Sequence, residues 1–170
     1  QRRQRGALAL ARGEHAHRQE FVAREPDTAH GGSRGDAGAH ALERDPAAQA
    51  KSDRRTRLAE VMEAAVRHFR LQLKTAAAAE ARGYLQRRGL SEAAQDRFEL
   101  GFAPAGWEGL RTALEAKGIA ADEMIDCGLV KASDKGRAPY DVFRNRIMFP
   151  IRDVRGRCIA FGGRAMDPND

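Results

Sequence analysis

The chain has 170 residues, of which 42% are hydrophobic and 32% charged, and its formal net charge is +6. This length and composition support one modest hydrophobic core rather than two large ones. No apolar run approaches the roughly eighteen residues that cross a bilayer, and no signal-peptide core is visible, so we expect a soluble protein with no membrane contact. The positive charge favours an acidic partner such as nucleic acid, although solubility alone also accounts for it.

Residues 1–50 are dominated by Gly, Ala, Arg and His, as in the stretch HGGSRGDAGAH at 30–40. Such a composition buries too little apolar surface to offset the loss of chain entropy on folding. We therefore predict a disordered segment or linker over 1–50, and a wrongly translated reading frame over 1–45 is an open alternative. No compact zinc-ligand spacing is formed by the histidines of this segment, which are His15, His17, His30 and His40.

From residue 51 onward, helical patterns come first. Over 54–73 the apolar side chains recur at three- and four-residue steps, which predicts an amphipathic helix. Shorter helices are predicted from serine caps, glycine stops and polar boundaries at 76–88, 92–98, 107–117 and 121–127. Short strands or extended connectors are predicted at 99–103 and 129–131.

Three side chains in these helices have the chemistry of nucleic-acid contacts. Arg87 and Arg88 lie in the last turn of their predicted helix, where positive charge complements the helix dipole, and we interpret them as end-of-helix charges. Trp107 is able to stack on a base, but packing against a neighbouring helix is the favoured interpretation.

The segment YDVFRNRIMFPIRDVRGRCIAFGGR, residues 140–164, concentrates positive charge. Only Asp141 and Asp153 oppose its six arginines, which gives a net charge of +4 by count and a surface that attracts polyanions. The arginines are Arg144, Arg146, Arg152, Arg155, Arg157 and Arg164. We expect Asp141 to orient Arg144 or Arg146 rather than to act as an acid or base.

The same segment predicts a β-hairpin. Residues 147–151 and 158–161 form two apolar runs that favour strands, with a turn at Arg155-Gly156. Alternation along a strand allows Phe149 and Ile151 to face a core, and Pro150 predicts an edge position or a bulge because it cannot donate to the ladder. Helices followed by strands indicate an α+β fold, with a helical first part and a small antiparallel β-rich part.

Cys127 and Cys158 are the two cysteines, and neither has a CxxC neighbour. We expect both to be buried, reduced thiols rather than a disulfide or metal ligands. Such thiols are typical of a cytoplasmic protein.

The segment 140–164 closely resembles the opening of the RNA-polymerase core of bacterial-type DNA primases, just upstream of the metal-binding Toprim fold. The phrases AEARGYLQRRGLSEAAQDRFELGFAP and GLRTALEAKGIAADEMIDCGLV resemble the helices that precede it in that family. The resemblance implies that residues 51–170 are the N-terminal subdomain of an incomplete catalytic core, with the Toprim portion beyond residue 170. Val142 departs from the family, which commonly has a basic residue there.

The resemblance also implies the chemistry. A DNA primase synthesises short RNA primers on single-stranded DNA, and this part would hold the template and the RNA–DNA primer duplex in a basic groove. The basic positions of the family match Arg144, Arg146 and Arg164 best, and Arg152 and Arg157 are further candidates that are alternatively hairpin surface charges. We expect no catalytic residue and no metal ligand in this chain.

Cofactors and partners of the parent protein follow from the same resemblance. Mg²⁺ would be bound by the missing Toprim portion, while the zinc ribbon that precedes the core in the family is absent or unrecognisable in this sequence, so zinc is not supported here. The expected partners are nucleoside triphosphates and, by family resemblance, a replicative helicase. The alternatives are a non-catalytic module that binds single-stranded nucleic acid, and a structural domain with a solvated basic face.

Overall fold

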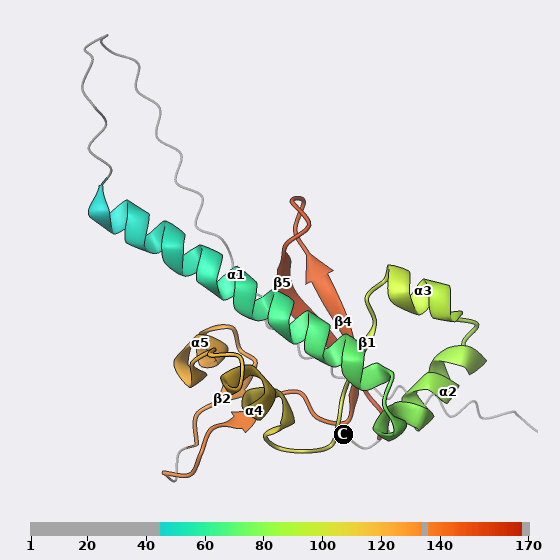
Figure 1. Ribbon diagram of the computed structural model, residues 1–170. Helices are drawn as coiled ribbons and strands as arrows, with labels where there is room; N and C mark the ends of the chain where they lie inside the picture. Colours follow the sequence, from blue (N-terminus) through green and yellow to red (C-terminus); the bar gives the residue numbers. More distant parts are fainter. Residues whose placement is uncertain (1–44, 134–135, 168–170) are drawn as a thin grey trace, which may run out of the picture.

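A computed structural model describes residues 45–133 and 136–167 of the chain (Figure 1). Its longest element is the helix α1, Pro46–Leu73. The helix begins earlier than residue 54 because the Asp45 side chain accepts a hydrogen bond from the amide of Ala47 (3.0 Å) and Pro46 occupies the first turn. Residues 46–56 are exposed, so this first part of α1 needs no apolar periodicity. Its residues 46–50 lie within the segment predicted to be a disordered region or linker, and they are helical. The rest of that segment, residues 1–44, lies outside the described residues.

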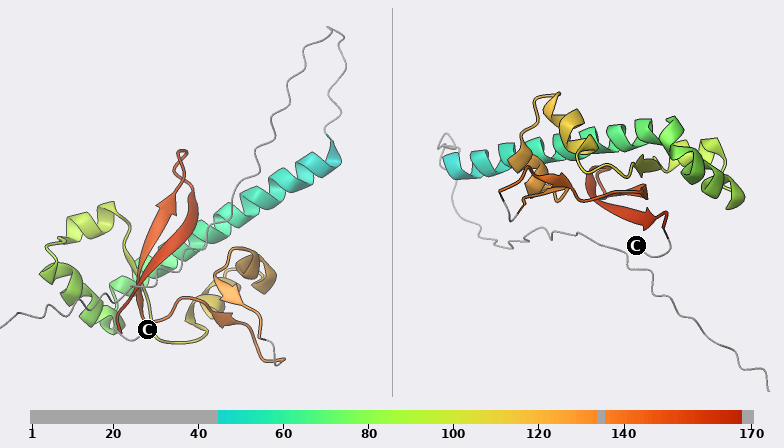
Figure 2. Two further views of the ribbon diagram at one scale, coloured as in Figure 1. Left: turned by 180° about the vertical axis from the view of Figure 1, so that it is seen from behind. Right: turned by 90° about the horizontal axis from the view of Figure 1, so that it is seen from below.

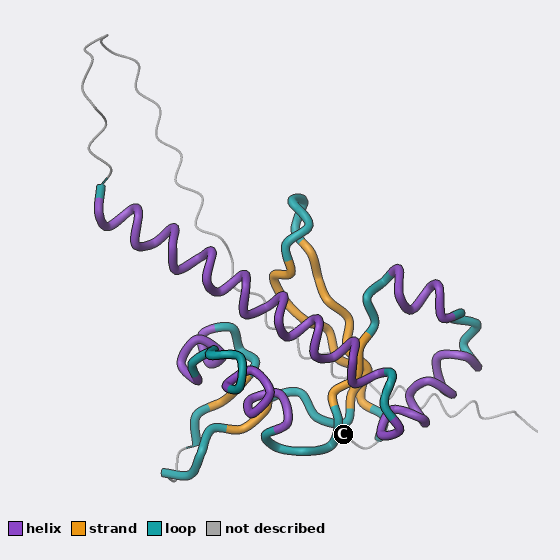
Figure 3. Tube along the Cα trace, in the orientation of Figure 1, coloured by secondary structure: helices purple, strands orange, loops and turns teal. Residues whose placement is uncertain are grey.

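A second group of helices lies beyond the carboxyl end of α1 (Figures 1 and 3). The predicted helix at 76–88 is a 3-10 turn, Ala76–Ala78, followed by α2, Ala79–Arg87. The next helix, α3, spans Glu92–Arg97, and the Ser91 side chain accepts from the amide of Ala94 (3.2 Å). The predictions of a serine cap and of a glycine stop at Gly89, whose φ is +77°, are therefore confirmed.

The main sheet is antiparallel, with the strand order β1-β4-β5. Its strands are β1, Gly101–Ala103; β4, Arg146–Arg152; and β5, Cys158–Ala165. The predicted hairpin is thus confirmed, and its turn is closed by the Asp153 carboxylate, which accepts from the amides of Arg155 and Arg157 (both 2.9 Å). The register shifts between Ile151 and Arg152, one residue beyond Pro150, as the proline predicts.

A smaller lobe packs beside the middle of α1 (Figure 1). It contains α4, Gly109–Glu115; α5, Ala121–Asp126; and the two-stranded ribbon of β2, Val130–Lys131, with β3, Tyr140–Asp141. The helix α4 begins two residues after the expected start at Trp107. Arg57 links α1 to this lobe, because its Nε donates a hydrogen bond to Glu123 of α5 at 2.6 Å.

The core consists of two apolar clusters on opposite sides of β4. Ile147 belongs to the cluster with α2, whereas Met148 belongs to the cluster with α1, α4 and α5, and both side chains are 0% exposed. We expected Phe149 and Ile151 to supply the core, but both are only half-buried. The reason is that apolar side chains cover both faces of the first half of β4, so the consecutive residues Ile147 and Met148 are both buried, as in strands with continuous apolar runs.

The close approach of α1 to the sheet depends on Gly101. A Cβ atom at this position would lie 2.5 Å from Cβ and 2.8 Å from the backbone carbonyl carbon of Phe69. Phe69 in turn packs edge-on against Phe161 at 5.3 Å and against Phe143 at 6.4 Å between ring centres. Figure 2 shows α1 lying along one face of the sheet, and this packing fixes the hairpin relative to the helix.

Both cysteines are free thiols; Cys158 is buried and Cys127 half-buried. Burial raises the pKa of Cys127 to about 12 and that of Cys158 to about 11, so both thiols are protonated at neutral pH. Among the described helices, none combines the length and apolarity that a bilayer crossing requires.

Candidate nucleic-acid interface

Arg144 lies in the loop that leads into β4, and its guanidinium is held by aromatic rings. The guanidinium carbon is 4.0 Å from the centre of the Trp107 ring and 5.9 Å from that of Tyr140. Its Nη1 donates to the backbone carbonyls of Asp141 and Val142. These contacts hold the charge on the surface in one position, as cation–π pairs with tryptophan do.

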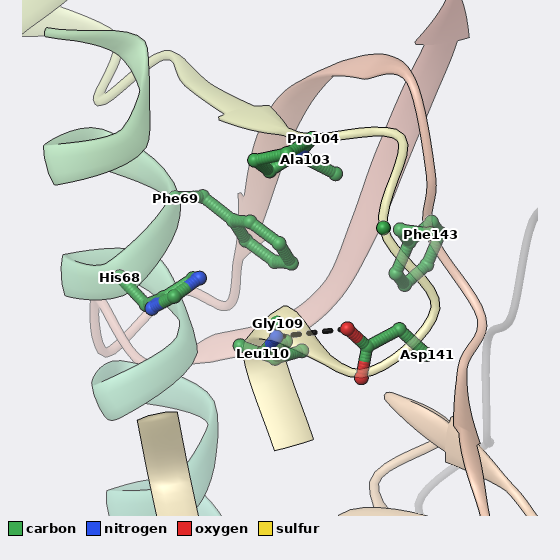
Figure 4. A pocket seen from close by; sticks show the side chains of 9 residues that line it. His68, Phe69, Ala103, Pro104, Gly109, Leu110, Asp141 and Phe143 are labelled. Carbon is green, nitrogen blue, oxygen red and sulfur yellow. Dashed lines mark hydrogen bonds between the residues drawn. The ribbon is translucent and has the colours of Figure 1, made fainter. Parts of the chain in front are cut away.

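Asp141 positions this loop through its backbone and caps α4 through its side chain. The carboxylate accepts from the amides of Leu110 (2.8 Å) and Arg111 (3.0 Å), as Figure 4 shows for Leu110. Burial raises the pKa of Asp141, against the opposing effect of these two amides. The expectation that Asp141 orients Arg144 is therefore correct only for its backbone carbonyl, because the carboxylate faces α4.

Arg146 and Arg164 lie at the same end of the hairpin as Arg144. Arg146 pairs with Ala165 and Ile147 pairs with Arg164 in the β4–β5 register, so the two arginines are on opposite faces of the sheet. The side chain of Arg146 lies over Gly163, where an added Cβ would come within 3.1 Å of the arginine Cδ. The glycine thus leaves the space that the arginine occupies.

Arg164 packs on a second aromatic ring, that of Tyr84 in α2. Its guanidinium carbon is 4.4 Å from the ring centre, and the Tyr84 hydroxyl accepts from Nε of Arg88 at 3.0 Å. Arg88 was interpreted as an end-of-helix charge, but it shares this tyrosine with Arg164. We call Tyr84, Arg88 and Arg164 the α2 cluster, and Trp107, Tyr140 and Arg144 the loop cluster.

Arg152 and Arg157 lie toward the other end of the hairpin and are paired within the protein. Arg152 donates to Glu63 of α1 (2.6 Å) and to Glu99 (2.5 Å), and these carboxylates raise its pKa. Arg157 donates to Asp153 at 2.6 Å. Arg152 follows Arg146 by six residue steps along β4, about 20 Å at 3.3 Å per residue. The geometry favours the alternative that Arg152 and Arg157 are hairpin charges.

The described residues do not suit a catalytic metal ion. Across 45–133 and 136–167, no three His, Cys, Asp or Glu side chains gather as metal ligands. Asp141 and Asp153, the acidic residues beside the arginines, cap α4 and the hairpin turn instead. The small pocket between Asp141 and His68 in Figure 4 has a volume of about 20 Å³, which holds one water rather than a nucleotide.

Sequence reasoning missed three members of this surface: Trp107, Tyr84 and Arg88. The prediction that Trp107 packs against a helix is wrong, because its side chain is 59% exposed. The position of Trp107 in the segment PAGW, before rather than within a helix, is the signal that indicates a loop. For Tyr84, the signal is Arg88 four residues later, which places both side chains on one helix face.

Comparisons with known proteins agree with this geometry. The family model for the N-terminal domain of the DNA primase catalytic core matches residues 68–170. The DNA primase of Escherichia coli K12 is 40% identical over 118 residues, which cover 69% of this chain and 20% of that protein. The DNA primase of Pseudomonas aeruginosa is 48% identical over 109 residues, covering 62% and 16%. The chain therefore spans about a fifth of the length of these relatives.

Solved structures give the same result. The DnaG primase catalytic domain bound to single-stranded DNA is 40% identical, with a TM-score of 0.61, and the match covers 68% of this chain and 37% of that one. The RNA polymerase domain of Mycobacterium tuberculosis DnaG, in complex with double-stranded DNA with a 6-nucleotide overhang, is 36% identical with a TM-score of 0.63, covering 68% and 35%.

A third similar structure, from Aquifex aeolicus, contains the zinc-binding and RNA polymerase domains of its primase. It is 28% identical, with a TM-score of 0.59, and the match covers 67% of this chain and 27% of that one. The α+β fold and the predicted resemblance are confirmed by these matches. The chain belongs to the family of the DNA primase catalytic core, N-terminal domain.

Proposed function

We propose that this chain is part of a DNA primase, an RNA-polymerising nucleotidyltransferase, and that it holds single-stranded DNA template and the primer duplex. The observation that carries the proposal is the gathering of Arg144, Arg146 and Arg164 at one end of the β4–β5 hairpin. The guanidiniums of Arg144 and Arg164 rest on the rings of Trp107, which is exposed, and Tyr84, which is half-buried. Within the described part of the chain, neither guanidinium forms an ion pair with a carboxylate. The DNA-bound structures of relatives support the choice of ligand.

The chemistry of arginine suits this task. A guanidinium forms two parallel hydrogen bonds to a phosphate and stays charged at all relevant pH values. Phosphate contacts position a nucleic-acid strand without reading its base sequence, so we propose that this chain binds DNA with little sequence preference. Arg152 and Arg157 are left out of the proposed contacts because Glu63, Glu99 and Asp153 already neutralise them.

The reaction itself needs groups that the described residues do not supply. Primer extension uses divalent cations to neutralise charge on the attacking and leaving oxygens. Because no metal-binding group is formed by the described residues, we propose that this chain contributes binding and orientation and does not incorporate nucleotides by itself. For the whole protein we propose a cytoplasmic location, with nucleoside triphosphates and a replicative helicase as partners.

The experiment is fluorescence anisotropy of a labelled single-stranded oligonucleotide titrated with the full chain at low salt. Replacing Arg144, Arg146 and Arg164 together by alanine should weaken binding about 100-fold, at about 1 kcal/mol for each charge-assisted contact. Arg155→Ala at the exposed hairpin tip removes one charge far from the proposed surface and is the matched control. Equal affinity of the triple variant and the wild type would reject the proposal.

A further inference from the structure

We propose that Asn145 is a positioning residue for the basic surface, and that its left-handed backbone conformation directs Arg144 away from the face of the hairpin that carries Arg146. This inference rests on the proposed function and deepens it, because Asn145 acts through the neighbouring arginine rather than through a contact of its own. The starting observation is the φ angle of Asn145, which is +46°.

A positive φ is rare outside glycine, because the side chain of an L-residue then crowds the following carbonyl oxygen. In the described part of the chain, Glu99 is the one other non-glycine residue with this conformation, at +51°. Glu99 directly follows α3 and its carboxylate accepts from Nε of Arg152 at 2.5 Å, so it belongs to the ion pairs that fix the far end of the hairpin. Asn145 lies instead between two arginines of the basic surface. Strained backbone of this kind concentrates at functional sites.

Two backbone hydrogen bonds hold Asn145 in this conformation. Its amide donates to the carbonyl of Pro104, just after β1, at 3.2 Å. Its carbonyl accepts from the amide of Met166, just after β5, at 3.0 Å. The peptide groups on both sides of Asn145 are thus fixed to separate segments, and the turn is formed before any ligand binds. A preformed turn lowers the entropy that binding would otherwise cost.

The turn at Asn145 sets the direction of Arg144. Residues two apart in an extended strand project from the same face, so an extended residue 145 would place Arg144 beside Arg146. In the structure they diverge. The Arg144 guanidinium carbon is 4.0 Å from the centre of the Trp107 ring, whereas the Arg146 side chain lies over Gly163 of β5. Two separated guanidiniums are able to bind two different phosphates of one strand, each with its own pair of hydrogen bonds.

Three replacements of Asn145 separate the backbone conformation from the side chain. Glycine adopts a positive φ freely, alanine does so at a moderate cost, and the β-branched valine at the greatest cost. Asn145→Gly, Asn145→Ala and Asn145→Val are made in the full chain, and each is titrated into a labelled single-stranded oligonucleotide followed by anisotropy. Circular dichroism gives the folded fraction, so that affinity is expressed per folded molecule.

A second measurement follows Arg144 without DNA. Trp107 is the single tryptophan of the chain, and Arg144 lies over its ring, so the emission of the free protein reports on the position of this guanidinium. Arg144→Ala supplies the emission of a ring without the cation. Glu99→Val is the matched control, because it disturbs the other positive-φ residue at the far end of the hairpin.

We expect Asn145→Gly to bind within about twofold of the wild type. Asn145→Val should weaken binding about 5- to 10-fold, as the loss of one charge-assisted contact does, and shift the emission as Arg144→Ala does. Adding Asn145→Val to Arg144→Ala should cost little more, because both changes remove the same guanidinium. Glu99→Val should lower stability but leave the emission and the affinity per folded molecule unchanged.

Two results would overturn the inference while leaving the proposed function standing. One is wild-type affinity and emission in folded Asn145→Val, or in Asn145→Ala if the valine variant does not fold. The other is a loss in Asn145→Gly as large as that in the alanine and valine variants, since the side-chain amide rather than the turn would then be needed. A wild-type chain that binds no single-stranded DNA would reject the proposed function and this inference together.

Discussion

Ile147 of β4 pairs directly with Arg164 of β5, so the side chain of Arg164 lies on the face of the sheet that is opposite to Arg146. The ring of Tyr84 lies beneath the Arg164 guanidinium at 4.4 Å. The basic end of the hairpin thus has two sides, one continuing into the loop cluster and the other into the α2 cluster. A DNA strand that contacts both sides has to cross the end of the sheet.

Tyr84→Ala should weaken binding of single-stranded DNA because the Arg164 guanidinium loses the ring on which it rests. We expect a loss of about 1 kcal/mol, close to that of Arg164→Ala, and little further loss in the double variant. Tyr84→Phe is the matched control, since it keeps the ring and removes only the hydroxyl that Arg88 contacts. Fully additive losses in the double-mutant cycle would show that Tyr84 does not act through Arg164.

Arg152→Ala should reduce the free energy of unfolding rather than the affinity for DNA. Arg152 joins the hairpin to α1 through Glu63 and to the segment that leads into β1 through Glu99, and its side chain is 27% exposed. Because these pairs are half-buried, we expect a loss of about 1–2 kcal/mol in urea unfolding. Arg157→Ala removes a more exposed pair with Asp153 and should cost about 0.5 kcal/mol or less. A large loss of DNA affinity in folded Arg152→Ala would contradict this assignment.

Gly101→Ala should destabilise the fold by about 2–3 kcal/mol, because the new methyl group would overlap the backbone of Phe69 in α1. Gly109→Ala is the control, since a Cβ at that position meets no atom within 4 Å and lies at the start of α4. Thermal unfolding of both variants tests the packing of α1 on β1. Similar melting temperatures for the two variants would mean that the helix lies farther from the sheet.

His68 should make the fold less stable as the pH falls from 7 to 5.5. Burial, together with the charge of Lys117, lowers the pKa of His68 below its ordinary value of 6.5, so the unfolded chain binds a proton first on acidification. The free energy of unfolding then decreases by up to about 1.4 kcal/mol per pH unit below the ordinary pKa. Asp141 lines the same pocket and is left in place by the replacement of His68 by Gln, so the difference between the variant and the wild type reports on His68. Replacing His68 by Gln should make the free energy of unfolding, measured with urea, depend less on pH across this range. An unchanged pH dependence would exclude His68 as its source.

Local signals predicted most of the elements. The Ser91 cap, the glycine stops and the apolar runs around Arg155-Gly156 each depend on a few neighbouring residues, and the structure has helices and strands where they indicate. The start of α1 was missed because its first turns are exposed and carry no apolar stripe. The signal that remained was the pair Asp45-Pro46.

The candidate site was less predictable because it depends on contacts between distant segments. Clustering in sequence grouped Arg152 with Arg144 and Arg146, but Glu63 and Glu99, far away in the chain, pair with Arg152 in space. Trp107 and Arg144 are likewise brought together by the contact of the loop after β1 with the loop before β4. No periodicity within one segment contains this information.

The salt dependence of single-stranded DNA affinity tests the central claim most directly. Three phosphate contacts release counterions equivalent to a slope of about −2 in a plot of log K against log salt, at about 0.7 per phosphate of a single strand. We predict that replacing Arg144, Arg146 and Arg164 by alanine makes the slope shallower by about this amount, while Arg155→Ala changes it little. Equal slopes for the wild type and the triple variant would contradict the assignment of these three arginines to the phosphate backbone.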